Sequence, residues 1–151
     1  MARIVSLPGS EPVGRFEQEV VDRIRTGLPD AWTLFPNFTL KQPGRDALEY
    51  DGVLFGPHAV YVLEAKEWFG HLSGDDTEWL LNGKPRACPM LTVNHKAKVL
   101  KNLLAAPRGV WVAPVLVLPD RATVAVGGGW TESITTLGKL VAHLTDTKRV
   151  P

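Results

Sequence analysis

The amino-acid sequence predicts an α/β fold in which a mixed central β-sheet is flanked by α-helices. Segments with apolar residues at helical spacing alternate with short apolar segments rich in β-branched and aromatic residues. Their order is helix, three strands, helix, two strands, helix. The chain has 151 residues, of which 44% are hydrophobic and 22% charged. These values are typical of one globular domain that folds without a disulfide or a structural metal.

The first half of the chain contains one predicted helix and three predicted strands. Residues 1–12 contain several Pro, Gly and Ser residues and are expected to form a flexible lead-in. Apolar residues at helical spacing predict a helix over residues 13–28. Residues 32–40 and 47–55 are expected to be extended and are separated by a turn. Residues 59–66 have the β-branched and aromatic content of a buried strand.

The next segment is less regular. Residues 67–88 are expected to form a loop with a short hairpin, because Asn82-Gly83 is a strong signal for a two-residue turn. A helix is expected over residues 91–104, where apolar residues share one face. The almost wholly apolar residues 110–118 are typical of a central strand.

The C-terminal part contains a short strand and a last helix. We expect the strand over residues 123–126, followed by a turn at residues 127–129. The helix is expected over residues 133–144, with Thr131 as its cap.

The whole forms one domain over residues 13–147. Residues 148–151 lack an obvious terminal element and are expected to begin a linker to a further domain.

Composition narrows the class of protein. The net charge is +1, so a nucleic-acid-binding surface would require local clustering of Lys and Arg. No apolar run approaches the roughly 20 residues that cross a bilayer, and the N-terminus lacks a secretory signal. Cys88 is the single cysteine and cannot form an internal disulfide. We therefore expect a soluble protein of the reducing cytoplasm, with no membrane partner.

Charged residues near the end of the third predicted strand indicate a possible site. Glu64 and Lys66 point to the same face, because side chains alternate along a strand. By itself this pair is an ordinary ion pair at a strand end. Asp51 lies in the preceding extended segment, and a hairpin of this length would bring it beside Glu64. Two converging carboxylates can hold Mg²⁺, and a lysine beside them can orient a water or stabilise charge on phosphate.

Glu17 is a fourth candidate. It flanks the apolar face of the first predicted helix, from which it could complete the metal site. The alternative is a boundary glutamate near a helix N-terminus, where the helix dipole favours negative charge.

The motifs around these residues resemble the nuclease-related domain family, NERD, of the PD-(D/E)xK nuclease superfamily. The resemblance extends from about Gly14 to Leu118. Its motifs are Glu17-x-x-Val20, Tyr50-Asp51-Gly52-Val53, and Val60-Tyr61-Val62-Leu63-Glu64-Ala65-Lys66 followed by Gly70. One position departs from the pattern, because Thr92 stands where family members often carry Gln.

The resemblance implies a restriction-endonuclease-like core and phosphodiester hydrolysis that depends on Mg²⁺ or Mn²⁺. Asp51 and Glu64 match the metal-binding acids, Lys66 matches the catalytic lysine, and Glu17 matches the acidic residue of the first helix. The substrate implied is nucleic acid, with DNA expected. NERD domains also occur fused to kinase or helicase regions, so a larger defence or DNA-processing protein is a further expectation.

Two alternatives follow from the same residues. The chain is either a metal-dependent nuclease or a non-catalytic nuclease-like module that binds nucleic acid or a partner and regulates an attached domain. In both cases a basic cluster is the expected phosphate-binding surface, although it could also be an ordinary solvated face. Its members lie on or just before the second predicted helix: Lys84, Arg86, His95 and Lys96.

Overall fold

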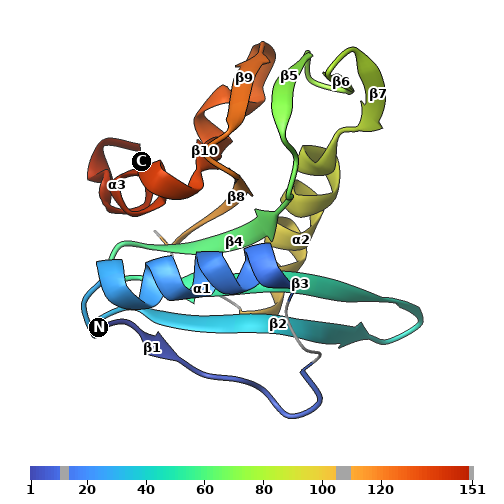
Figure 1. Ribbon diagram of the computed structural model, residues 1–151. Helices are drawn as coiled ribbons and strands as arrows, with labels where there is room; N and C mark the ends of the chain where they lie inside the picture. The colour runs from blue at the N-terminus through green and yellow to red at the C-terminus, as the bar shows by residue number, and fades with distance from the viewer. Residues whose placement is uncertain (11–13, 105–109, 150–151) are drawn as a thin grey trace.

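The computed structural model describes residues 1–10, 14–104 and 110–149. It confirms the predicted fold class, a mixed sheet flanked by helices (Figure 1). The central sheet has six strands in the order β1-β2-β3-β4-β8-β10. The strands are β1 (Arg3–Ile4), β2 (Thr33–Gln42), β3 (Arg45–Phe55), β4 (Ala59–Ala65), β8 (Trp111–Leu118) and β10 (Ile134–Thr136). β2, β3 and β4 pair antiparallel, whereas β4, β8 and β10 run parallel.

A second sheet lies beside the first and was only partly predicted. Its four strands have the order β7-β6-β5-β9: β5 (Gly70–Gly74), β6 (Glu78–Leu81), β7 (Lys84–Ala87) and β9 (Ala122–Val126). The hairpin at Asn82-Gly83 is confirmed: both residues have positive φ, 52° and 79°, as a two-residue turn requires. The prediction of a loop over residues 67–88 was otherwise wrong. β5 is stabilised by parallel pairing with the distant β9, which no local pattern indicates.

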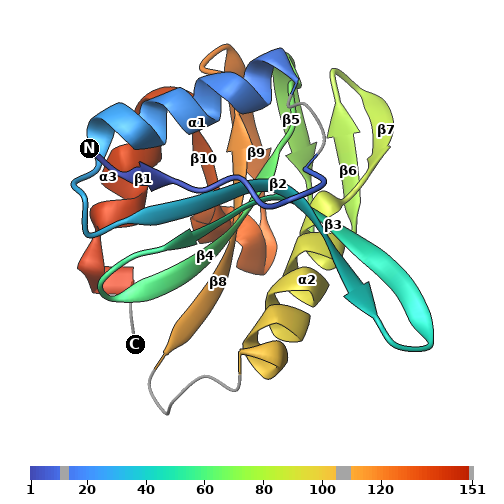
Figure 2. The same cartoon turned by 90° about the horizontal axis from the view of Figure 1, so that it is seen from below.

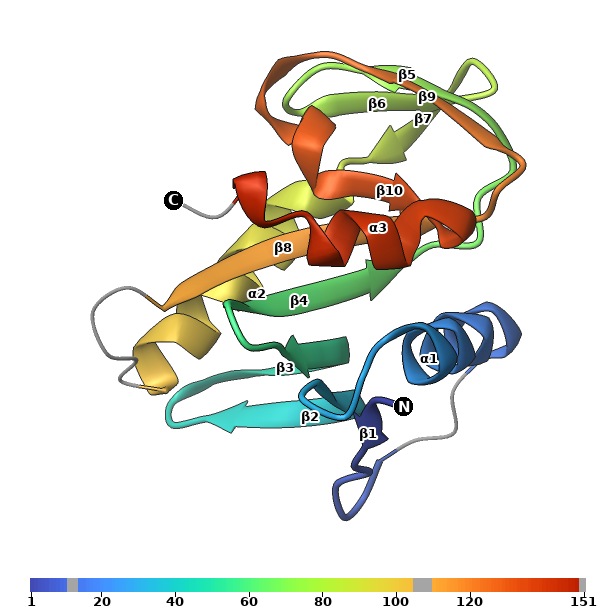
Figure 3. The same cartoon turned by 90° about the vertical axis from the view of Figure 1, so that its left-hand side faces the viewer.

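The helices cover opposite faces of the central sheet (Figures 1 and 3). α1 (Arg15–Gly27) and α3 (Leu140–Thr145) pack on one face, and α2 (Pro89–Leu103) packs on the other. Short 3-10 helices occur as η1 (Gly128–Ser133), η2 (Leu137–Lys139) and η3 (Thr147–Arg149). No helix in the described ranges is both long and apolar enough to span a bilayer.

The prediction of a last helix over residues 133–144 was wrong for the first half of that range. Residues 134–136 are Ile-Thr-Thr and form β10, which extends the sheet beside β8. β-branched residues favour this extended backbone. Thr131 does not cap a helix but lies within η1, where its Oγ1 donates a hydrogen bond to the Val126 carbonyl at 3.0 Å.

Both chain ends differ from their predicted character. Arg3–Ile4, within the expected lead-in, form β1 and pair parallel with β2 (Figure 2). This pairing satisfies backbone groups at the edge of β2. Thr147–Arg149 form η3, at the start of the expected linker. Residues 11–13, which include the end of the lead-in and the predicted start of the first helix, and residues 150–151 of the linker lie outside the described residues.

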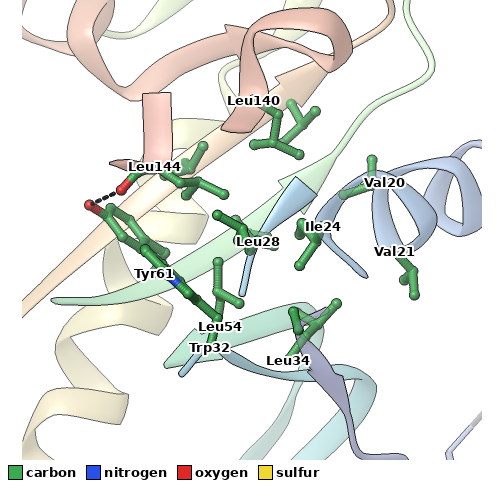
Figure 4. Close-up of a cluster of buried hydrophobic side chains, with 14 of the residues drawn as sticks. Val20, Val21, Ile24, Leu28, Trp32, Leu34, Leu54, Tyr61, Leu140 and Leu144 are labelled. Atoms are coloured by element: carbon green, nitrogen blue, oxygen red, sulfur yellow. Dashed lines mark hydrogen bonds between the residues drawn. The ribbon is translucent and has the colours of Figure 1, made fainter. Parts of the chain in front are cut away.

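Two hydrophobic clusters anchor the elements that carry the charged residues. On one face, Ile24 of α1 is fully buried among residues from the sheet and α3 (Figure 4). In the same cluster, the Tyr61 hydroxyl donates a hydrogen bond to the Leu144 carbonyl at 3.3 Å. On the other face, Val93 and Ala97 of α2 are buried against β4 and β8. The sheet, α1 and α2 are therefore held in one arrangement around the end of β4.

Candidate active site

The predicted site lies where β3 and β4 separate. The last pair between them is Gly52 with Leu63. Asp51 and Glu64 each lie one residue beyond that pair on their own strands. Asp51 Oδ2 accepts a hydrogen bond from the Ala65 amide at 2.9 Å, so its side chain spans the opening between the strands. The structure thus brings together the two acids that the sequence places on neighbouring strands.

Two lysines contact the Glu64 carboxylate. Lys66 Nζ lies 3.8 Å from Oε1, and Lys96 Nζ lies 3.5 Å from Oε2. The side chains of Glu64 and Lys96 are only 13% and 11% exposed, whereas that of Lys66 is 38% exposed. Glu64 is therefore a nearly buried acid with a lysine at each oxygen, and only Lys66 reaches well into solvent.

Glu17 approaches the same region from α1. It lies in the first turn, where it accepts a hydrogen bond from the backbone of Gly14, the N-cap residue. This interaction is half of a capping box, so Glu17 also stabilises the start of its own helix. A small cavity of about 10 Å³ separates α1 from the strands and is lined by Glu17 and Asp51 together with apolar side chains. A space of this size holds about one water-sized particle.

The electrostatics show that negative charge accumulates here. Burial raises the pKa of Glu64, and repulsion from Asp51 raises it further, while the two lysines oppose the rise. The pKa of Glu17 is also raised, first by burial and then by Asp51, against the opposing effects of the Gly14 hydrogen bond and Lys66. Asp51 therefore acts electrostatically on both glutamates. A region with this excess of carboxylate charge favours a bound cation.

The carboxylates of the site are suitable ligands for a hard divalent ion, but they are few. Mg²⁺ is commonly held by only one or two carboxylates, with waters and substrate phosphate completing its shell. Asp51 and Glu17 line the same cavity, and the charge of Asp51 raises the pKa of both Glu17 and Glu64. Within residues 1–10, 14–104 and 110–149, no group of three or more His, Cys, Asp and Glu side chains is gathered closely enough to hold a metal by itself.

Lys96 is a site residue that sequence reasoning assigned elsewhere. It was expected on a phosphate-binding surface, but it is buried in the structure, where the residue as a whole is 9% exposed. Burial raises the pKa of Tyr50 to about 12, and the protonated hydroxyl donates to the Lys96 carbonyl at 2.8 Å. A signal was present in the sequence: Lys96 lies three residues after Val93 and four before Leu100, so it shares the apolar face of α2.

The other predicted surface residues lie apart from this group. Lys84 and Arg86 are exposed on β7, at the edge of the second sheet, and His95 is exposed on α2. The two aromatic residues after Lys66 differ in their packing and exposure. Trp68 packs edge-on against Trp79 with ring centroids 6.4 Å apart, whereas Phe69 is 48% exposed.

Comparisons with known proteins identify the family of the chain. The family model described as nuclease-related domain, NERD, matches residues 14–119, which include Glu17, Asp51, Glu64, Lys66 and Lys96. The chain is also similar to a protein of Streptomyces coelicolor named "Probable kinase PglW", with 32% identity over 113 residues. That match covers 69% of this chain but only 7% of the Streptomyces protein. No solved structure matches the chain significantly.

Proposed function

The chain belongs to the nuclease-related domain family, and we propose that it is a Mg²⁺-dependent nuclease domain that hydrolyses phosphodiester bonds of DNA. The observation that supports the proposal is that the Asp51 carboxylate accepts a hydrogen bond from the amide of Ala65, the residue after Glu64, at 2.9 Å, and that Lys66 Nζ lies 3.8 Å from the Glu64 carboxylate. Family membership alone establishes only a nuclease-related fold, because a fold does not determine an activity.

In this proposal, Asp51 and Glu64 hold the ion, and Glu17 supports it from α1. Mn²⁺ would serve in the same place. When bound, the ion supplies Lewis-acid stabilisation of the phosphate charge and lowers the pKa of water. The hydrogen bond from Ala65 orients Asp51, and the two lysines orient Glu64, so the carboxylates are arranged before any ligand arrives. Such preorganisation reduces the reorganisation that the reaction requires.

Lys66 is the residue that we expect to act on the reacting groups. Its ammonium lies beside Glu64 yet reaches solvent, so a phosphate can approach it. There it can position the attacking water and stabilise the negative charge that develops on phosphate. Hydrolysis forms a bond from the water oxygen to phosphorus and breaks the bond from phosphorus to the leaving sugar oxygen. The water's proton passes to solvent, and the leaving oxygen is protonated.

The test is cleavage of plasmid and of labelled single- and double-stranded oligonucleotides, with Mg²⁺ and with EDTA. We expect Mg²⁺-dependent cutting by wild type and none by the Asp51→Ala, Lys66→Ala double variant. Glu49→Ala with Lys139→Ala is a matched control, since both residues lie outside the candidate site, and it should cut normally. Equal rates for wild type and the double variant, or equal rates with EDTA, would reject the proposal.

A second candidate function is a non-catalytic module that binds nucleic acid or a partner and regulates an attached domain. The observation that favours it is the similarity to a protein named as a probable kinase, of which the matched region is 7%. Fusion or association with a kinase or helicase domain would belong to this function. Calorimetric titration with Mn²⁺ separates the two candidates, because only the nuclease requires saturable binding that Glu64→Gln abolishes.

The cellular location that accompanies either function is the cytoplasm. Cys88 is buried and free in the structure, which suits a reducing compartment.

A further inference from the structure

The Lys96 side chain is held in place by more contacts than an ordinary surface lysine. Its Nζ lies 3.5 Å from Glu64 Oε2 and 5.9 Å from the centroid of the Tyr50 ring. The Tyr50 hydroxyl donates to the carbonyl of the same lysine at 2.8 Å. The ammonium is therefore buried between an acid on β4 and an aromatic ring on β3, while the backbone that carries it is fixed to β3.

We propose that Lys96 is a positioning residue that acts as the resident cation of the site. In the absence of a divalent ion, its ammonium neutralises Glu64 and keeps that carboxylate in place. A divalent ion must then compete with Lys96 for Glu64. The inference deepens the proposed function and rests on it, because it takes Asp51 and Glu64 to be the ion's ligands.

The difference between the two lysines supports this assignment. Both oxygens of Glu64 face an ammonium, so an ion that takes either oxygen must share it or displace a lysine. The Lys66 side chain is 38% exposed and can move into water, whereas that of Lys96 is 11% exposed. The positive charge of Lys96 therefore stays beside Glu64 when an ion approaches. Its repulsion of the ion limits how tightly the ion binds.

Fold stability by itself gives little reason for this buried ion pair. Replacing both members of such a pair by apolar residues is often neutral or stabilising, whereas removing one member leaves a buried charge without a partner. A lysine is therefore needed on α2 as long as Glu64 is retained on β4. Since Glu64 is the proposed ligand, the role of Lys96 is tied to the site and not to the hydrophobic core beside it.

The experiment is a Mn²⁺ titration, with free Mn²⁺ measured by electron paramagnetic resonance. Lys96→Met removes the charge and keeps a similar side-chain length, Lys96→Arg keeps the charge, and Lys98→Met is a control on the exposed face of the same helix. We expect Lys96→Met to lower the Kd about tenfold, the scale of losing one like charge a few Å away. The Arg variant and the Lys98 control should stay within about twofold of wild type.

The outcomes separate this inference from the proposed function. Wild-type affinity or weaker affinity in Lys96→Met would overturn the inference and leave the metal site standing. Binding by Lys96→Met that requires Asp51, with none by wild type, would support the inference and reject the wild-type chain as a metal-dependent nuclease. Absence of binding in every variant would overturn both.

Folding of the variants is checked by circular dichroism, and Lys96→Gln is a second neutral variant. If neither neutral variant folds, the wild-type protein decides the question by NMR of its lysine Cε resonances. Mg²⁺ should shift the Lys96 resonance and leave Lys98 in place. An unmoved Lys96 resonance at saturating Mg²⁺ would overturn the inference.

Discussion

The Asp51 carboxylate accepts a hydrogen bond from the Ala65 amide, with 2.9 Å between Oδ2 and the backbone nitrogen. Asp51 lies one residue beyond the last β3–β4 pair, Gly52 with Leu63, and Ala65 lies two residues beyond it. The hydrogen bond therefore replaces a backbone interaction at the place where the strands separate. Because this bond also holds the proposed metal ligand, Asp51 has a structural role beside its proposed functional one.

These two roles can be separated by two substitutions. Asp51→Asn keeps an oxygen that accepts from Ala65 but removes the charge, whereas Asp51→Ala removes both. We expect hydrogen exchange of the Ala65 amide to be about tenfold faster in Asp51→Ala, the scale of one lost charge-assisted hydrogen bond, and near wild type in Asp51→Asn. Both variants should lose Mn²⁺ binding. Glu49→Ala, on the same strand, is the control. Unchanged exchange in Asp51→Ala would show that the bond does not protect β4.

The exposed cations on β7 test the predicted nucleic-acid surface. Lys84→Glu with Arg86→Glu should weaken binding of a labelled DNA duplex and reduce the salt dependence of log K by about two if each residue contacts one phosphate. Fluorescence anisotropy at several salt concentrations measures both effects. Arg3→Glu with Arg23→Glu makes the same charge change on β1 and α1. If the two double variants behave alike, β7 has no special role in binding.

The glycine turn after β9 has a specific packing requirement. Gly128 has φ of 82°, and a Cβ there would overlap the Asp76 carboxylate, which accepts a hydrogen bond from the Gly129 amide at 2.9 Å. Gly128→Ala should lower the free energy of unfolding by about 1–3 kcal/mol, from strain and the displaced carboxylate. Gly129→Ala is the matched control, because nothing lies within 4 Å of its Cβ position. Urea unfolding compares them, and equal stabilities would contradict the expected clash.

The turn before β6 contains a carboxylate that should make the stability of the fold depend on pH in the acid range. Asp75 Oδ1 accepts hydrogen bonds from the amides of Glu78 at 2.8 Å and Thr77 at 2.9 Å, which lower the pKa of this carboxyl group. Because the folded state favours the charged form, Asp75 stabilises the fold above its unfolded pKa and loses that contribution as pH falls through the lower folded pKa.

Asp75→Ala should therefore be less stable than wild type at pH 7, and the difference should shrink on acidification below the ordinary aspartate pKa of about 3.9. Urea midpoints at pH 7, 4 and 2.5 measure this. Asp46→Ala, which removes an exposed carboxylate on β3, is the control. A difference that is constant over this pH range would exclude the ionised carboxylate as its source.

The local sequence was sufficient to predict features of the fold that depend on a single helix, strand or turn. The apolar stripe of α1, the three strands from Thr33 to Ala65 and the Asn82-Gly83 turn follow from residue spacing and backbone preference, which act over a few residues. The position of Asp51 and Glu64 at the same end of the β3–β4 hairpin was predictable for the same reason, because a short hairpin leaves few possible registers. The acids and Lys66 could thus be grouped before the fold was known.

Tertiary structure decided the features that depend on distant segments. β5 pairs with β9 and β10 pairs with β8, and both pairings depend on backbone hydrogen bonds between segments far apart in the chain. The same holds for Lys96: its spacing shows that it faces the core, but only the packing of α2 against β4 shows that it meets Glu64. Side-chain periodicity identifies the face of a helix and carries no information about what lies opposite. That partner is what distinguishes a buried cation of the site from a basic residue on the surface.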